Sequence, residues 1–197
     1  MTAEDRRQSI IDATITVIAR LNYESATTAL IAKEAGVNEA LIYAHFKSKK
    51  ELQLATLDYL IKYRLGIYRS NPVFKKENKD QSILKAINAQ YLERIQRPDV
   101  NMFSCLLKAI FAIDEDIRKK GMDCSLALYE FNKQNLIEDG RRGFFNNRFD
   151  PDIVAWEILG SIMLISTLAV TGRLDDFGIE KIKKSLDYFE AVHMTKT

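Results

Sequence analysis

Hydrophobic residues recur at intervals of three and four along most of this chain, which is the spacing of one face of an α-helix. The first such face consists of Ile10, Ile11, Ile15, Ile18 and Leu21. Short helices are predicted over residues 27–35 and 38–46, and a longer one from residue 49 to about 66. Alternating strand patterns are scarce. The pattern therefore predicts an all-α protein.

A polar stretch, YRSNPVFKKENKDQS over residues 68–82, interrupts the helical pattern. Because proline and short polar residues mark loops, we expect a domain boundary beside it. The first domain is predicted to cover residues 1–66 and the second residues 67–197. Further helices are expected over about 84–95, 102–113, 115–138, 151–171 and 179–192.

Composition narrows the class of protein. The 197 residues carry a formal net charge of +2, which by itself does not indicate nucleic-acid binding. The N-terminus lacks a signal-peptide pattern, and the apolar run at residues 158–170 is shorter than the roughly 20 residues that cross a bilayer. We expect a cytoplasmic protein without a membrane segment, whose two cysteines, Cys105 and Cys124, are reduced and packed.

Residues 27–52 have the requirements of a helix–turn–helix. Thr27 and Asn38 can cap two short helices, and Gly36 can adopt the left-handed turn between them. Ile42 and Phe46, four residues apart, can bury one face of the second helix. The opposite face is then free to enter the major groove of DNA.

Lysines follow this corner in the sequence KSKK. Lys47, Lys49 and Lys50 would place positive charge beside the exposed helix, where the phosphates of DNA require it. A solvated helical corner is the alternative for each feature alone. Together they predict binding to double-stranded DNA.

The same stretch closely resembles the N-terminal domain of the TetR family of bacterial transcription regulators. The resemblance rests on IAKEAGV, residues 31–37, followed by LIYAHFKSKKEL, residues 41–52, which is about a quarter of the chain with the residues around it. It implies a three-helix helix–turn–helix domain joined to a helical ligand-binding and dimerisation domain. By resemblance, Thr27, Tyr43, His45 and Lys49 contact phosphates. The complete set of candidate DNA-binding residues is Thr27, Asn38, Glu39, Ala40, Leu41, Tyr43, Ala44, His45, Lys47 and Lys49.

Two candidate residues depart from the family pattern. The family often has Lys or Arg where Glu39 stands and a small hydroxylic residue where Leu41 stands, which puts individual contacts in doubt. Glu39 can accept from a cytosine amino group, or it can instead satisfy the helix N-terminus. Ala40, Leu41 and Ala44 can contact thymine methyl groups. We therefore expect thymine and cytosine to matter more than guanine.

The second domain offers apolar residues for two roles. An apolar small-molecule effector is expected to contact Tyr91, Phe103, Leu106, Phe111, Tyr129, Trp156 and Met163. A homodimer, implied mainly by the resemblance, is expected to use Leu159, Ile162, Met163, Ser166, Ile182, Leu186 and Phe189. For both sets the alternative is that they form the core of one chain.

These expectations converge on a ligand-responsive transcription regulator that binds a palindromic operator as a dimer. We expect the protein to act as a repressor, because repression is the more common mode of action in the family that it resembles. The alternative is a dimer of the same fold that binds ligands or proteins and has lost DNA binding. The only histidines are His45 and His193, and the sequence has no catalytic, cofactor-binding or metal-ligand pattern. We therefore expect no enzymatic activity, no cofactor and no metal.

Overall fold

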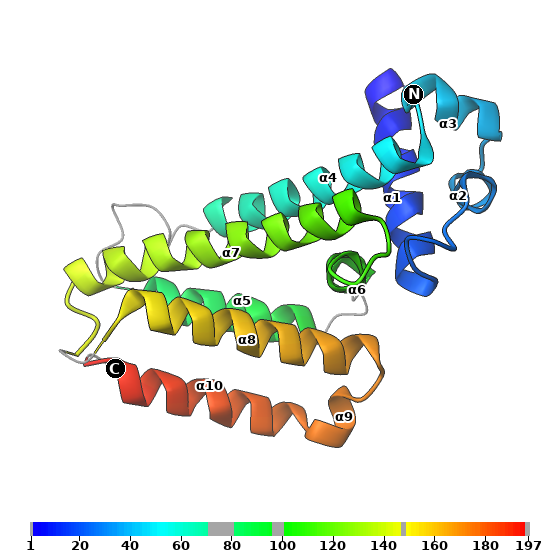
Figure 1. The fold of residues 1–197 in the computed structure, drawn as a ribbon. Coiled ribbons are helices and arrows are strands. Elements are labelled where there is room, and N and C mark those ends of the chain that lie inside the picture. Colours follow the sequence, from blue (N-terminus) through cyan, green and yellow to red (C-terminus); the bar gives the residue numbers. More distant parts are fainter. Residues whose placement is uncertain (1, 71–80, 96–100, 147–148, 196–197) are drawn as a thin grey trace. The chain divides into compact units, whose positions relative to one another are not determined.

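The computed structural model describes residues 2–70, 81–95, 101–146 and 149–195. Within these ranges the regular structure is helical, apart from one isolated bridge between Phe145 and Met194, so the all-α prediction is confirmed. The helices, labelled in Figure 1, are α1 (Ala3–Arg20), α2 (Thr28–Ala35), α3 (Glu39–His45), α4 (Lys49–Ser70), α5 (Ile83–Ile95), α6 (Asn101–Ala109), α7 (Glu115–Arg141), α8 (Pro151–Val170), α9 (Leu174–Phe177) and α10 (Ile179–His193).

Contacts divide the chain into two compact units. The first unit comprises residues 1–63 and 101–125, and the second comprises residues 64–100 and 126–197. This division differs from the expected boundary at residue 66, because residues 101–125 pack with the N-terminal helices. The polar stretch expected to mark the boundary lies largely outside the described residues, which omit 71–80.

The first unit is built around α1. Its capping box satisfies the helix start, since the amide of Asp5 donates to Thr2 Oγ1 (3.1 Å) and the amide of Thr2 donates to Asp5 Oδ2 (2.8 Å). The apolar face predicted from the spacing of its isoleucines is buried against α2 and α6. Fully buried side chains from α1, α2, α3 and α4 meet there, including Ile10, Ile18, Ile31, Ile42 and Leu57.

Helix α6 closes against α1 through polar contacts as well as apolar ones. The Nζ of Lys108 donates to the carbonyls of Ala19 (2.6 Å) and Leu21 (2.8 Å) at the end of α1. These carbonyls have no partner within the helix, so the lysine serves as a C-terminal cap from another element. Such long-range contacts explain why the segment joins the first unit, although it follows the N-terminal helices by many residues.

Gly121 allows α6 and α7 to approach closely. A Cβ at this position would lie 2.6 Å from the Cβ of Ala109. Glycine is a poor helix former, so a break in the helix could be expected here. The structure instead shows a continuous α7 in which the missing side chain makes room for its neighbour.

In the second unit α5, α8 and α10 lie side by side (Figure 1). The start of α5 is held by the buried carboxylate of Asp139 on α7. This carboxylate accepts from the hydroxyl of Ser82 (2.8 Å) and the amides of Ile83 and Leu84 (both 3.0 Å). Burial raises the pKa of Asp139, although these three donors oppose the shift.

Helix α8 agrees with the helix expected over residues 151–171 and extends beyond the apolar run that it contains. The expected run of residues 158–170 is part of a 20-residue helix that begins at Pro151, capped by Asp150. By length and composition alone this helix is long and apolar enough to cross a membrane, a test that core helices of soluble proteins also pass. It also packs within the second unit, where Val154, Ala155 and Ile158 are buried, as in core helices of soluble proteins.

Candidate nucleic-acid interface

The helix–turn–helix corner forms as its sequence predicts. Gly36 ends α2 in the left-handed conformation, with φ of 65°, and the amide of Val37 donates to the carbonyl of Ala32 (3.0 Å). Ile31 on α2 and Ile42 on α3 are fully buried, and Phe46 closes the corner behind them. The position of α3 is therefore set by its apolar face.

The outer face of α3 carries mostly small side chains, which are uncharged except at the ends of the helix. Ala40 and Ala44 are exposed, and the side chain of Tyr43 is 51% exposed. Leu41, predicted to contact thymine methyl groups, and His45, expected by resemblance to contact a phosphate, are half-buried. This face has the shape needed to approach base edges, since two alanines allow close contact.

Thr27 and Asn38 begin α2 and α3 as predicted. Thr27 Oγ1 accepts from the amide of Leu30 (3.2 Å), and Asn38 Oδ1 accepts from the amide of Leu41 (2.9 Å). Both side chains are exposed. Because Thr27 only accepts in its cap, its hydroxyl proton remains able to donate to a phosphate.

Glu39 makes a contact that the sequence did not predict. Its Oε1 accepts a hydrogen bond from the hydroxyl of Thr28, which also lies 3.3 Å from the hydroxyl of Tyr43. Thr28 is buried at the first position of α2, eleven residues before Glu39. One oxygen of the carboxylate therefore joins α2 to α3. Sequence reasoning missed Thr28, because a threonine beside Thr27 reads equally well as a second candidate for the helix cap.

The lysines differ in what they contact. Lys49 Nζ donates to the carbonyl of Glu24 (2.7 Å), so this predicted phosphate contact is held against the turn between α1 and α2. Lys50 forms ion pairs with Asp114 (3.1 Å) and Asp116. The hydrogen bonds that the Lys50 ammonium group donates to Asp116 and Asp114 raise the pKa of Lys50. The side chain of Lys47 is exposed.

The start of α4 satisfies its own amides. The amide of Glu51 donates to Ser48 Oγ (3.1 Å), and the Glu51 carboxylate accepts from the amide of Lys47 (2.8 Å). This arrangement resembles a capping box. The Glu51 carboxylate therefore places a negative charge beside the amides that precede α4.

The cysteines of the first unit are free and buried, in agreement with the prediction of packed thiols. Burial raises the pKa of Cys105 to about 12 and that of Cys124 to about 11. The hydroxyl of Tyr23 lies 3.1 Å from Cys105 Sγ and donates to the Cys105 carbonyl. Both thiols therefore stay protonated and unreactive near neutral pH.

The predicted effector-binding residues are divided between the units. Phe103 and Leu106 lie on α6 in the first unit, and Phe111 follows α6 with its side chain 76% exposed. In the second unit Tyr129 packs edge-on against Trp156, with ring centroids 6.4 Å apart. The Tyr129 hydroxyl donates to Asp152 (2.5 Å), which raises the pKa of Tyr129. The other two candidates are Met163, which is half-buried, and Tyr91, whose side chain lies outside the described residues.

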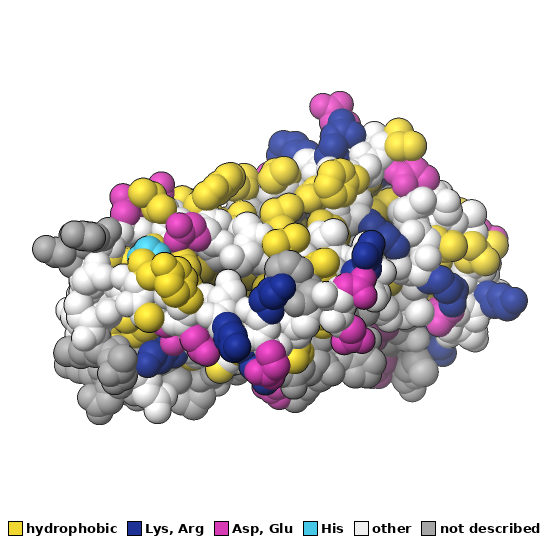
Figure 2. All heavy atoms as spheres, turned by 90° about the horizontal axis from the view of Figure 1, so that it is seen from below, with side chains coloured by type: hydrophobic (Ala, Val, Ile, Leu, Met, Phe, Trp, Pro, Cys, Tyr) yellow, Lys and Arg dark blue, Asp and Glu magenta, His cyan; other side chains and the backbone are white. Residues whose placement is uncertain are grey.

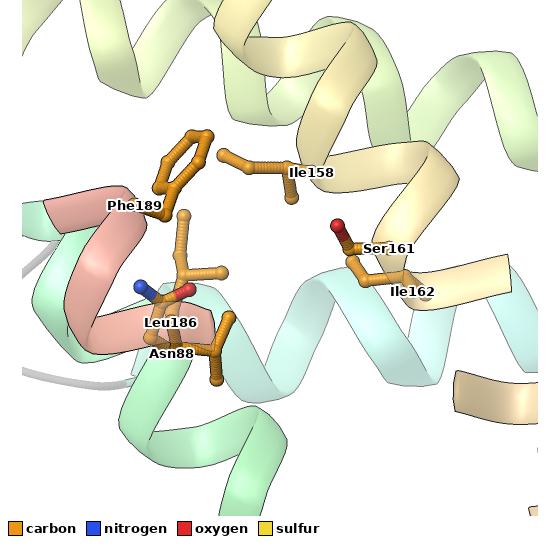
Figure 3. A pocket seen from close by; sticks show the side chains of 7 residues that line it. Asn88, Ile158, Ser161, Ile162, Leu186 and Phe189 are labelled. Carbon is orange, nitrogen blue, oxygen red and sulfur yellow. The ribbon is translucent and has the colours of Figure 1, made fainter. Parts of the chain in front are cut away.

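A small cavity lies elsewhere in the second unit, among α5, α8 and α10 (Figure 3). It holds about 20 Å³, which is room for a water molecule and far less than a typical ligand site. Its lining consists of Ile87, Asn88, Ile158, Ser161, Ile162, Leu186 and Phe189. Asn88 Nδ2 also donates to Glu190 on α10 (2.8 Å). The cavity therefore uses three residues predicted for the dimer rather than those predicted for the effector.

Most of the predicted dimer residues face the interior of the second unit. Leu159, Ile162, Ser166 and Ile182 are buried within the chain, while Met163, Leu186 and Phe189 are half-buried. The packing of α8 against α5 and α10 explains this placement, since the same stripes serve the core of the unit. A different set of large apolar side chains is exposed on these two helices: Ile153, Trp156, Leu164, Tyr188 and Val192. Figure 2 looks at the side of α10 and shows hydrophobic side chains gathered along this face.

Comparison with known proteins assigns the corner to a family. The family model described as "Bacterial regulatory proteins, tetR family" matches residues 10–56. The HTH-type transcriptional regulator BetI of Serratia proteamaculans (strain 568) is 43% identical over 58 residues, which is 29% of this chain and 29% of that protein. The chain thus spans less than a third of the length of this curated relative.

Solved structures share the whole fold. A transcriptional regulator from Saccharomonospora viridis, in complex with choline, has a TM-score of 0.76 at 21% identity, covering 98% of this chain and 100% of the other. FadR from Bacillus subtilis, in complex with stearoyl-CoA, has a TM-score of 0.74 at 20% identity, covering 92% and 96%. Residues 10–56 therefore match the tetR family model and form the predicted helix–turn–helix, and the chain as a whole shares the fold of these solved regulators.

Proposed function

We propose that this protein is a cytoplasmic transcription regulator that binds a palindromic operator as a homodimer and is released from it by a small-molecule effector, most simply as a repressor. The observation that supports this proposal is the exposed face of α3, held by a buried corner and flanked by capped helix starts. A reading helix of this kind enters the major groove, and two copies bind half-sites about 34 Å apart.

The side chains of α3 favour particular bases. Ala40 and Ala44 are exposed and can contact thymine methyl groups. Glu39 has one oxygen engaged by Thr28, so its second oxygen is available to accept from a cytosine amino group. The face lacks Arg and Gln, the residues that most often contact guanine and adenine through two hydrogen bonds. We therefore expect half-sites in which thymine and cytosine matter more than guanine.

The proposed dimer uses the exposed faces of α8 and α10. Trp156 is 66% exposed and Tyr188 is 72% exposed, and large apolar side chains so placed are typical of protein interfaces. Gly160 and Ser161 on the same helix are also exposed and small, which permits close approach. This replaces the dimer surface expected from the buried residues Leu159, Ile162 and Ile182.

The effector is proposed to be a largely apolar small molecule bound in the second unit. Two regulators of the same fold were solved with choline and with stearoyl-CoA, so the fold can hold ligands of different size. The cavity beside Asn88 and Ser161 would have to widen to admit either kind of molecule, since it has room for water only. Titration of Trp156 fluorescence with candidate compounds, alongside DNA binding, tests this part of the proposal. A compound that binds without changing DNA affinity argues against the coupling.

Selection of the purified protein against random duplex DNA at physiological salt tests the proposed function. Enrichment of an inverted repeat is the expected result, with few conserved guanines opposite α3. If a folded, dimeric sample enriches nothing, the selection is repeated after unfolding, ligand removal and refolding, to exclude a co-purified inducer. Failure of both selections would mean that this family member has lost sequence-specific DNA binding.

A further inference from the structure

Lys50 stands in the first turn of α4, within the lysine cluster that should meet DNA phosphates. Its ammonium group lies 3.1 Å from Asp114 Oδ2 and is also paired with Asp116. All three residues belong to the first unit. A cation of the DNA-binding surface is thus already neutralised by two carboxylates of the same chain.

The segment that carries these carboxylates is tied to the DNA-binding helices independently of Lys50. The amide of Ile113 donates to Glu24 Oε1 (2.7 Å), in the turn between α1 and α2. Asp114 Oδ1 accepts from the amides of Asp116 (2.9 Å) and Ile117 (3.2 Å) and so caps α7. These contacts hold both carboxylates beside the lysine.

The neighbouring Lys49 is linked to the same segment through Glu24. Glu24 accepts from Lys49 through its backbone carbonyl and from the amide of Ile113 through its side chain. An open hollow of about 420 Å³ lies at this junction. It is lined by Tyr23, Glu24, Lys49, Lys50, Gln53, Ile113 and Asp114. The segment before α7 therefore influences two of the predicted phosphate-contacting lysines.

We propose that Asp114 and Asp116 act as an internal counter-ion that competes with a DNA phosphate for Lys50 and lowers the affinity of the protein for DNA. This inference rests on the proposed function and adds a means of regulating it. The carboxylates occupy the donors that a phosphate would use, and their negative charge opposes the approach of the DNA backbone.

The ion pairs are weak enough to exchange. The side chains of Lys50 and Asp114 are each 42% exposed and that of Asp116 is 64% exposed, and pairs so exposed contribute little to stability. A movement of the segment 109–116 away from α4 therefore frees Lys50 and strengthens DNA binding. Contacts that hold the segment in place keep affinity low.

Charge-neutralising substitutions separate this role from a purely structural one. Asp116→Asn removes one carboxylate, which forms an ion pair with Lys50. Asp114→Asn removes the other and keeps a good helix cap, since Asn caps helices as well as Asp does. Asp123→Asn is the matched control, because Asp123 pairs with Lys119 (3.2 Å) on α7 of the same unit.

The measurement is fluorescence anisotropy with a labelled duplex carrying the selected operator and with an unrelated duplex of equal length, over a range of salt concentrations. Asp116→Asn should bind both duplexes about two- to fivefold more tightly at ~0.1 M salt, and the double variant more tightly still. The slope of log affinity against log salt should steepen by about one, the value for one added phosphate contact. Asp123→Asn should keep the wild-type slope.

Lys50→Gln completes the experiment. This substitution should change the affinity for DNA little in the wild-type protein. In the Asp114→Asn, Asp116→Asn double variant it should remove the gain in affinity for DNA. If the wild type binds DNA while the acidic variants follow Asp123→Asn, or bind more weakly with an unchanged circular dichroism spectrum, the counter-ion role is wrong and the proposed function stands. If no variant binds any duplex, the proposed function fails and this inference fails with it.

Discussion

Helices α3 and α8 both present surface that their own unit does not cover, but the two surfaces differ in kind. The outer face of α3 is short and mostly small, with Ala40 and Ala44 beside one aromatic ring. The outer face of α8 carries the large apolar side chains Ile153, Trp156 and Leu164. The first suits the narrow space and polar edges of a DNA groove, and the second suits another apolar protein surface.

The inner faces of the two helices show a second difference. The inner face of α3 consists of a few residues, so its position depends on Ile42 and Phe46 and on the turn at Gly36. The inner face of α8 spans several turns and shares its contacts with α5 and α10. A single substitution should therefore disturb the first unit at α3 more than the second unit at α8.

The largest expected effect follows from shortening the buried side chain of α3. Ile42→Ala should destabilise the protein by about 2 to 5 kcal/mol, because it leaves a cavity at a fully buried site. Leu164→Ala, on the exposed face of α8, should cost less than about 1 kcal/mol in the monomer and should weaken self-association. Chemical denaturation measures the first effect, and analytical ultracentrifugation measures the second. Equal losses of folding stability in the two variants would show that α3 is no more sensitive to substitution than α8.

The second-largest effect is expected at the buried carboxylate of Asp139 in the second unit. Asp139→Ala should cost about 2 to 4 kcal/mol, because the hydroxyl of Ser82 and two amides of α5 lose their acceptor. The raised pKa of Asp139 adds a pH dependence: the folded state binds this proton more tightly than the unfolded state does. The stabilisation that comes from protonated Asp139 is therefore complete at pH values below the pKa of this group in the unfolded state. It is lost as the pH rises through the pKa of this group in the folded state. Wild-type stability relative to Asp139→Asn should accordingly increase as the pH falls, measured by urea denaturation at several pH values.

The close approach of α6 and α7 in the first unit should be sensitive to a single methyl group. Gly121→Ala places a Cβ 2.6 Å from Ala109 Cβ and should cost about 1 to 3 kcal/mol, despite the better helix propensity of alanine. Gly66→Ala on α4 is the matched control, since a Cβ there meets no atom within 4 Å in the described part of the chain. Thermal unfolding should show a lower midpoint for the first variant and an unchanged or higher one for the second.

The smallest effect concerns buried hydroxyl groups. In the first unit Thr14 donates to the carbonyl of Ile10 (2.7 Å), whereas in the second unit Ser166 is buried and its hydroxyl has no hydrogen-bond partner among the described residues. Ser166→Ala should therefore be neutral or stabilise the protein by up to about 1 kcal/mol, while Thr14→Val should destabilise it by about the same amount. Denaturation midpoints test the signs. A clear loss of stability in Ser166→Ala would show that the hydroxyl is satisfied by a contact such as a bound water.

The helical class, the corner at residues 27–52 and its caps could all be predicted from the order of the amino acids. These are local features: the spacing of Ile31, Ile42 and Phe46 sets the buried faces, and Gly36 and Asn38 set the turn within a few residues of one another. Because each contact spans a short stretch of chain, few alternative arrangements satisfy the same pattern. The resemblance to a known family added the expected roles of the exposed residues.

The exposed helix faces and the paired charges, in contrast, could be identified only from the packing of the helices. An apolar helix such as α8 offers several faces of similar hydrophobicity, so its sequence does not show that Leu159 and Ile162 turn inward while Trp156 and Leu164 turn outward. Likewise, Lys50 and Asp114 lie far apart in the sequence and meet only because α6 and α7 pack beside α1 and α4 in the first unit. Such pairings depend on long-range packing, in which many weak contacts together select one arrangement that no short sequence pattern encodes.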